Sequence, residues 1–182
     1  MDSPFLELVG LSARSFLAIV LIVAGAAKLA DKANFSATLA RLGVSSHQET
    51  RSILALLLPI SELALGLFVA SGLWSGLANV AVLLVMLGFD GVTLYAIRRA
   101  PDTTCRCFGA LSDTPFNQKT LLRNAVLTAL AVIALVSSEF PVVSSGASPW
   151  LVAVVLAGYL VVALAAVHAA RVVQSMRERM SA

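Results

Sequence analysis

Residues 53–71 read ILALLLPISELALGLFVAS, and this stretch determines the fold class. A helix needs about 20 mostly apolar residues to cross the hydrocarbon core of a bilayer, and the stretch meets that length. Its one charged residue, Glu62, stands near the middle. Because a charge inside a membrane usually faces protein or a water-filled cavity, we expect a membrane-spanning helix that turns Glu62 toward other helices.

The rest of the chain is also strongly apolar and carries few charges. Of its 182 residues, 59% are hydrophobic and 13% are charged, whereas a soluble domain is about half apolar and a quarter charged. The charged residues form blocks between long uncharged runs. The net charge of +3 does not point to a nucleic-acid partner, since basic residues flank membrane spans for topological reasons. The composition predicts an integral membrane protein.

We expect an all-α, polytopic membrane bundle of about five transmembrane helices, a four-helix core plus an additional C-terminal helix. The expected spans are residues 15–29, 53–71, 76–97, 121–138 and 149–170. The short link SGLWSG makes the second and third spans an antiparallel hairpin. In domain terms, residues 1–138 form the bundle, with a cysteine loop at 98–120, and residues 139–182 add a loop, the fifth helix and a basic tail.

Two segments near the N-terminus allow further predictions. Phe35, Leu39 and Leu42 recur at i, i+4 and i+7 between the first two spans, which predicts a short amphipathic helix at the membrane interface. The start FLAIVLIVAGAA has the apolar core and small residues of a cleaved signal peptide. We favour a retained span, because Asp2 and Glu7 precede it and Lys28 ends it.

The basic residues fall on one side of the predicted spans. Under the positive-inside rule this side is cytoplasmic, so we expect an inner (plasma) membrane protein with its N-terminus outside and its cysteine loop and C-terminus inside. Only Arg14 falls on the other side. The residues on the basic side are Lys28, Lys32, Arg41, Arg51, Arg98, Arg99, Arg106, Lys119, Arg123, Arg171, Arg177 and Arg179.

Several ionisable residues lie inside or at the ends of spans. Pro59, Glu62 and Gly66 share one helix face, which we expect to point into the bundle. Asp90 shares a face with Asn79, eleven residues earlier. Lys28 and Arg123 are expected at the same depth, with Lys28 able to snorkel at its span's end. Two interpretations stay open: packing salt bridges, or a polar pocket or proton route that serves thiol chemistry.

Both cysteines of the chain lie in the stretch PDTTCRCFGALSD, residues 101–113. A disulfide between Cys105 and Cys107 closes a very small ring, so it should be strained and therefore oxidising. Arg98, Arg99 and Arg106 favour the thiolate form. The pattern indicates a reactive pair, and it leaves open a structural disulfide or a Cu(I) or Zn(II) site, to which His47 could contribute.

Short motifs in a fixed order add a resemblance. They are AGAAKLAD (24–31), the set Phe35, Leu39, Arg41, Leu42 and Gly43, LLPISELALGL (57–67), CRCFGALS (105–112) and LLRNAVL (121–127). Over residues 14–135 the chain resembles the methylamine-utilisation MauE family, within the broader DoxX-like membrane proteins. Cys105 and Cys107 match the family's C-x-C-F-G pair. Its membrane motifs are matched by Lys28, Pro59, Glu62, Gly66, Arg123 and Asn124.

The resemblance implies thiol–disulfide redox chemistry beside a thioredoxin-like partner, in support of a disulfide-containing client, which in the family is methylamine dehydrogenase. We therefore expect Cys105 and Cys107 to react, supported by Lys28, Glu62, Asp90, Arg123 and Asn124. One pair cannot carry electrons across a bilayer, so a second carrier such as a quinone is a candidate. A metal-handling protein and a non-catalytic membrane subunit remain the alternatives.

Overall fold

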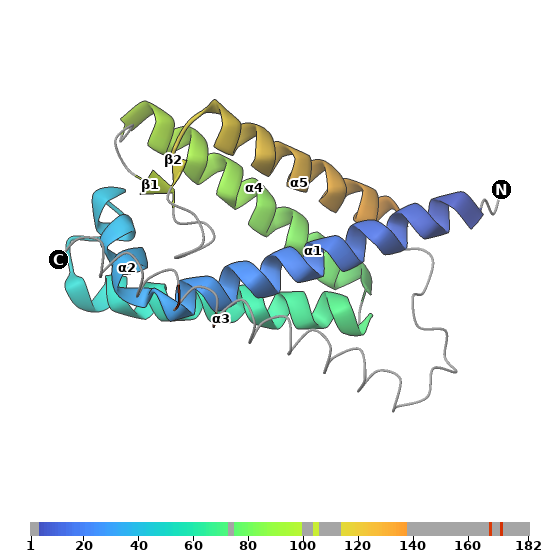
Figure 1. Ribbon diagram of the computed structural model, residues 1–182, viewed down its shortest axis with the longest axis horizontal. Helices are drawn as coiled ribbons and strands as arrows, with labels where there is room; N and C mark the ends of the chain where they lie inside the picture. The colour runs from blue at the N-terminus through green and yellow to red at the C-terminus, as the bar shows by residue number, and fades with distance from the viewer. Residues whose placement is uncertain are drawn as a thin grey trace.

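The computed structural model describes residues 4–72, 75–99, 104–105 and 114–137, together with residues 168 and 172. Within these ranges the chain forms five helices and two very short strands (Figure 1). The elements are α1 (Pro4–Ala30), α2 (Lys32–Arg41), α3 (Gln48–Ser71), α4 (Ser75–Arg99), β1 (Thr104–Cys105), β2 (Thr114–Pro115) and α5 (Gln118–Val136).

Four segments are long and apolar enough to cross a membrane, and they correspond to the first four predicted spans. They are Val9–Ala30, Gln48–Ser71, Gly76–Arg99 and Gln118–Val136. The helical bundle is thereby confirmed for this part of the chain. Of the fifth predicted span, the structure describes only His168, which is exposed.

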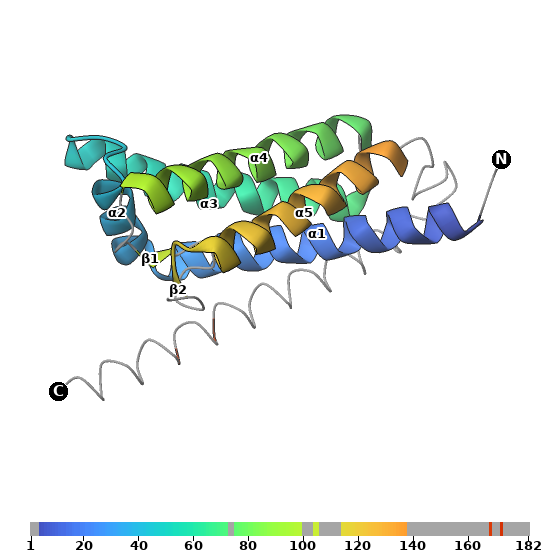
Figure 2. The same cartoon turned by 90° about the horizontal axis from the view of Figure 1, so that it is seen from above.

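The long helices pack in two pairs, α1 with α3 and α4 with α5, and α1 also contacts α5. Figures 1 and 2 show the pairs side by side, with α2 and the two strands at one end and the N-terminus at the other. The core lies between the pairs and includes Leu17, Leu21, Val82, Met86 and Leu127. Large apolar side chains on the outside, such as Leu77, Leu84 and Leu122, are exposed, as expected for a surface that lipid covers.

Glycine brings α1 and α3 close together. A Cβ atom on Gly25 would lie 2.7 Å from the carbonyl oxygen of Pro59, and one on Gly66 would lie 2.7 Å from Cγ1 of Ile22. Both distances are shorter than van der Waals contact, so a larger residue at either point would force its neighbour to shift. Pro59, Glu62 and Gly66 are all buried, which confirms that their shared face points into the bundle.

The predicted amphipathic helix is present as α2, but its apolar face does not lie toward lipid. Phe35 and Leu39 pack against Ala55 and Leu54 of α3. Leu42, at the C-cap, is also buried. Gly43 then adopts a positive φ of 70°, and hydrogen bonds from Gly43 N to Ala40 O and from Val44 N to Leu39 O close the helix end, in the pattern of a Schellman motif. Helix α2 therefore covers the end of the bundle.

Arg14 corrects the predicted start of the first span. The helix begins at Pro4, so Arg14 lies inside it rather than in the outer loop, and it is 4% exposed. Its guanidinium donates hydrogen bonds to the carbonyl oxygens of Ser137 and Ala134, at 2.5 and 3.5 Å. Asn79 of α4 also donates to Ala134 O, at 3.0 Å. These donors satisfy carbonyls at the C-terminal end of α5, which the helix itself leaves without partners.

Candidate functional site

Lys28 and Glu62 form a buried ion pair between α1 and α3. The Lys28 ammonium lies 2.7 and 2.6 Å from the two carboxylate oxygens of Glu62. Lys28 is 2% exposed and Glu62 is 4% exposed. The expectation that Lys28 snorkels to the membrane surface is wrong, because its charge is neutralised within the bundle.

Two aromatic rings flank the Lys28 ammonium. The centroid of Phe89, on α4, lies 5.0 Å from Nζ, and that of Phe35, on α2, lies 5.8 Å away. Both distances are within the range of cation–π attraction. The ammonium is thus contacted from three elements besides its own helix: α2, α3 and α4.

A second set of polar contacts joins α4 to α5 at the same end of the bundle. Thr128 donates a hydrogen bond to Asp90 Oδ2 at 2.6 Å, and the Asn124 amide donates to Thr93 Oγ1 at 3.0 Å. Arg123 donates to Asn124 Oδ1 at 3.3 Å. The predicted polar residues therefore form two groups, one in each helix pair.

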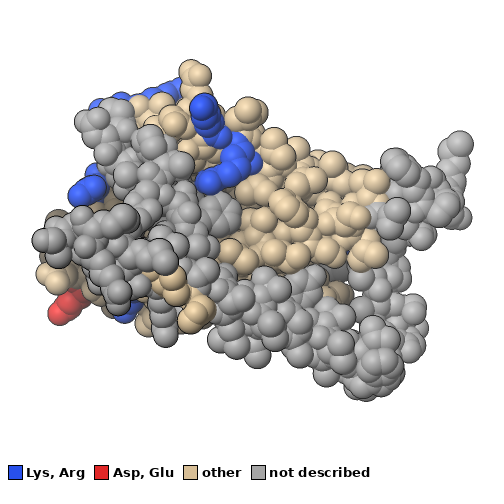
Figure 3. All heavy atoms as spheres, in the orientation of Figure 1, with Lys and Arg blue, Asp and Glu red and all other residues tan. Residues whose placement is uncertain are grey.

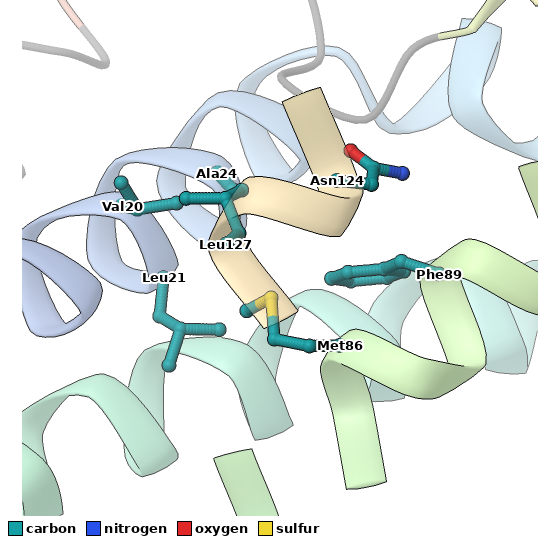
Figure 4. A pocket seen from close by; sticks show the side chains of 7 residues that line it. All are labelled: Val20, Leu21, Ala24, Met86, Phe89, Asn124 and Leu127. Carbon is teal, nitrogen blue, oxygen red and sulfur yellow. The ribbon is translucent and has the colours of Figure 1, made fainter. Parts of the chain in front are cut away.

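A small pocket lies between α1, α4 and α5, next to both groups (Figure 4). Six of its lining side chains are apolar and the seventh is Asn124; the apolar ones are Val20, Leu21, Ala24, Met86, Phe89 and Leu127. The space open to the centre of a water molecule is about 20 Å³, which is room for about one water. The pocket is too small for an organic cofactor.

Within the cysteine loop, β1 and β2 pair in a two-residue antiparallel ladder. Thr104 pairs with Pro115, and Cys105 pairs with Thr114. The ladder brings the chain leaving α4 back beside the chain entering α5, at the end of the bundle that α2 covers (Figure 2). The backbone of Cys105 is thus located, whereas Cys107 lies outside the described residues.

Two contacts fix the start of α5: the packing of Phe116 and the N-cap Asn117. Phe116, directly after β2, is 5% exposed and forms an apolar cluster with Leu42 and Ala96. Asn117 is the N-cap of α5, and its side chain accepts a hydrogen bond from Thr120 N at 3.0 Å. An N-cap of this type satisfies one of the free amides of the first turn.

A family model described as methylamine utilisation protein MauE matches residues 6–137. The chain belongs to the MauE family. The match extends from the first turns of α1 to the end of α5 and includes the whole cysteine loop. No curated protein and no solved structure matches the chain. With its four apolar helices, this MauE-family chain is a multi-pass membrane protein.

In this MauE-family protein the basic side chains gather at the cysteine-loop end. Lys32, Arg41, Arg98, Arg99 and Lys119 are exposed there. In Figure 3 the blue Lys and Arg atoms lie at the end occupied by α2 and by the loop ends of α4 and α5, and the tan surface toward the N-terminus shows none in that view. The asymmetry that the sequence predicts is therefore present on the surface.

The sequence points to Lys28, Glu62, Asp90, Arg123 and Asn124 as supporting residues, and the structure gives each of them a polar contact at this end. It did not predict their partners Thr93 and Thr128, nor that the rings of Phe35 and Phe89 lie beside Lys28. Hydroxyls and aromatic rings are common in membrane helices, so they carry no signal in a single sequence. Within the described ranges, no group of three or more His, Cys, Asp and Glu side chains is arranged to hold a metal.

Proposed function

We propose that this MauE-family protein is an integral membrane thiol–disulfide redox protein. Cys105 and Cys107 exchange disulfides with a thioredoxin-like partner and so support the maturation of a disulfide-containing client. The observation that carries this proposal is the β1–β2 ladder, which holds the backbone of Cys105 opposite Thr114 at one end of the bundle, within the residues that the family model matches. A cysteine on a fixed backbone, in a loop preceded by Arg98 and Arg99, suits a reaction with another protein.

The exchange consists of two thiol–disulfide steps. One cysteine thiolate attacks a sulfur of the partner's disulfide and forms a mixed disulfide, while the partner's other sulfur leaves as a thiolate. The second cysteine then attacks its neighbour's sulfur and releases the fully reduced partner. The pair has lost two electrons and two protons, and the partner has gained them. The reverse sequence regenerates the dithiol.

The polar residues of the bundle have a supporting role in this proposal. The Lys28–Glu62 pair fixes α1 against α3, and the Asp90–Thr128 and Asn124–Thr93 contacts fix α4 against α5. These contacts lie at the bundle end from which the loop extends. Electron transfer across the membrane needs a second carrier, for which a quinone or a partner's thiols are suitable.

The orientation is part of the same proposal. Five exposed basic side chains mark the loop end, and positive residues favour the cytoplasmic side. We therefore assign the protein to the inner membrane, with the cysteine loop inside and the N-terminus outside.

Trapping of the mixed disulfide tests the proposal. The reaction of each single variant with oxidised thioredoxin is quenched with N-ethylmaleimide, which blocks the released thioredoxin thiol before it reverses the reaction. If Cys105 attacks first, Cys107→Ser should then show a covalent adduct that dithiothreitol releases; if Cys107 attacks first, Cys105→Ser should show it. The wild-type protein should resolve the adduct and leave reduced thioredoxin, measured by mass spectrometry. The double variant is the control and should form nothing.

Three outcomes would contradict the proposal. One is that neither single variant forms an adduct while the double variant keeps full activity in cells, which would favour a non-catalytic subunit. The second is that only the dithiol form binds stoichiometric Cu(I) or Zn(II) and the double variant loses it, which would favour metal handling. The third is that the pair stays oxidised through every cycle, as a structural disulfide would.

A further inference from the structure

The outer face of α4 changes from apolar to basic at the loop end of the helix. Leu84 and Tyr95 are eleven residues apart, about three turns, so they share a face, and both are exposed. Arg98 and Arg99 follow Tyr95 by three and four residues and extend this face, exposed, into the last turn. A surface that is apolar along most of its length and cationic at one end matches a molecule with hydrocarbon chains and an anionic end.

Helix α5 has the same arrangement in the opposite chain direction. Lys119 is exposed in the first turn. Leu122 and Val126 follow it by three and seven residues, so they share its face, and both are exposed. The apolar outer face of α5 therefore begins with a cation.

The basic turns of α4 and α5 are neighbours. The two helices pack against each other, and Ala96 of α4 lies in one cluster with Phe116, just before α5. Arg98 follows Ala96 by two residues, and Lys119 follows Phe116 by three. The exposed cations of both helices therefore lie at the same level, at the edge of the surface that lipid covers.

The other pair of long helices does not present such a surface at this end. Lys28 of α1 is buried in its ion pair. In the first turn of α3 the exposed charged side chain is Glu49, and half-buried Arg51 donates a hydrogen bond to the Ser45 carbonyl at 3.1 Å. Among the four described spans, an exposed apolar face that ends in an exposed cation is therefore confined to α4 and α5.

Helix α2 also carries exposed cations, but without an apolar face beside them. Lys32 and Arg41 are exposed, whereas Phe35 and Leu39, the large apolar side chains of this helix, are buried. An anionic headgroup at α2 would thus find no large apolar side chain on that helix for its acyl chains.

We propose that the α4–α5 face binds an anionic phospholipid. Arg98, Arg99 and Lys119 hold the headgroup phosphate, and the exposed apolar side chains contact the acyl chains. Tyr95 lies between the two regions, where aromatic side chains meet headgroups in membrane proteins. An acidic protein would contact the cations alone, whereas a phospholipid contacts both the cations and the apolar face that continues from them. The face consists of Leu84, Tyr95, Arg98, Arg99, Lys119, Leu122 and Val126. This lipid site is separate from the proposed thiol exchange.

Lipid binding to the purified full-length protein in detergent provides the test. Dioleoylphosphatidylglycerol and dioleoylphosphatidylcholine, which have identical acyl chains, are titrated separately, and native mass spectrometry gives the affinity for each. The wild-type protein should bind phosphatidylglycerol at least about tenfold more tightly, because basic side chains near an anionic lipid surface each contribute about fivefold. Glycerol phosphate, the headgroup without acyl chains, should not compete at equal concentration.

Two double variants separate this face from the general positive charge. Arg98→Gln with Lys119→Gln should weaken phosphatidylglycerol binding by roughly 25-fold, about fivefold for each cation, and leave phosphatidylcholine binding unchanged. Lys32→Gln with Arg41→Gln is the matched control, since it also removes one Lys and one Arg from exposed positions. It should leave the preference for phosphatidylglycerol unchanged. Without added lipid, both variants should unfold like the wild type, because only exposed side chains differ.

Equal affinity of the wild type for the two lipids would overturn the inference. So would an equal loss in both double variants, which would show diffuse attraction by the net charge. Competition by glycerol phosphate at equal concentration would reduce the face to a site for free phosphate. If Arg98→Gln with Lys119→Gln keeps the lipid preference but no longer exchanges with thioredoxin, the basic turns dock a protein and the inference is wrong.

Discussion

Lys28 and Glu62 are the residues whose burial most needs explanation. Removal of a charged group from water costs several kcal/mol, and a paired opposite charge offsets that cost only when the geometry is good. Here both carboxylate oxygens lie within 2.7 Å of the ammonium, and Phe35 and Phe89 cover it. The pair is therefore stable as a unit, and each member depends on the other.

That dependence predicts an unusual mutational pattern. Lys28→Met or Glu62→Leu alone should destabilise the protein by about 3–5 kcal/mol, since each leaves one buried charge uncompensated. The double variant should be more stable than either single variant. The measurement is reversible unfolding in mixed dodecyl maltoside and SDS micelles, followed by circular dichroism.

Lys32→Met is the matched control for this experiment, since Lys32 is exposed and surface changes of this kind usually stay within about 0.5 kcal/mol. A double variant whose loss equals the sum of the single losses would show that the two side chains act independently and would refute the interpretation.

At this scale the sequence singles out the charged residues of the spans but does not predict how they are paired. Glu62 and Lys28 stand out because charge is rare in apolar stretches. The sequence places Asp90 and Arg123 at the same depth as this pair, but the structure gives Asp90 a hydroxyl donor, Thr128, and gives Arg123 an amide acceptor, Asn124. Depth follows from sequence spacing, whereas pairing depends on the rotation of helices about one another.

Among the elements, the contact between α1 and α3 depends on two glycines. Gly25 faces Pro59 and Leu63, and Gly66 faces Ala18 and Ile22. Small residues let membrane helices approach closely, and the packing gained there replaces the hydrophobic effect that lipid does not provide. Both close contacts are near the ion pair, because Gly25 is one turn before Lys28 and Gly66 is one turn after Glu62.

Gly25→Ala should therefore destabilise the bundle by about 1–3 kcal/mol, the usual range for an overpacked contact. Gly88→Ala is the matched control: its Cβ would meet nothing within 4 Å, and alanine is the better helix former by about 1 kcal/mol. It should be neutral or stabilising. The same micelle unfolding experiment compares the two, and equal effects of both substitutions would contradict the close-contact argument.

Helix α2 shows what periodicity can and cannot predict. The spacing of Phe35, Leu39 and Leu42 correctly identifies the helix and its apolar face. It does not reveal what covers that face, because a helix face has the same apolar spacing whether lipid or protein covers it. In the structure, residues of α3 and α4 together with Phe116 cover this face. The contact of Phe116 could not be predicted, because a single aromatic residue in a polar loop does not indicate which surface it packs against.

For the whole molecule, the uneven distribution of charge predicts its orientation. After reduction, Cys105 and Cys107 should react with a membrane-impermeant maleimide in inverted membrane vesicles but not in intact cells. In a background lacking both cysteines, Ser75→Cys at the start of α4, at the opposite end of the bundle, should label in intact cells. Labelling of both positions from the same side, or with the sides exchanged, would contradict the assigned topology.

The central place of α1 has a consequence for biosynthesis. Its partners are α3 and α5, so the first helix to leave the ribosome contacts the last described helix of the bundle. Lys28 enters the membrane region before Glu62 has been translated, and Arg14 does so before the carbonyls of Ala134 and Ser137 exist. Until then, each cation must stay hydrated near a membrane surface or within the insertion machinery. Assembly is thus expected to proceed in two stages. Glu62 first secures the α1–α3 pair, and the end of α5 then docks on Arg14 at the end of the bundle opposite the cysteine loop.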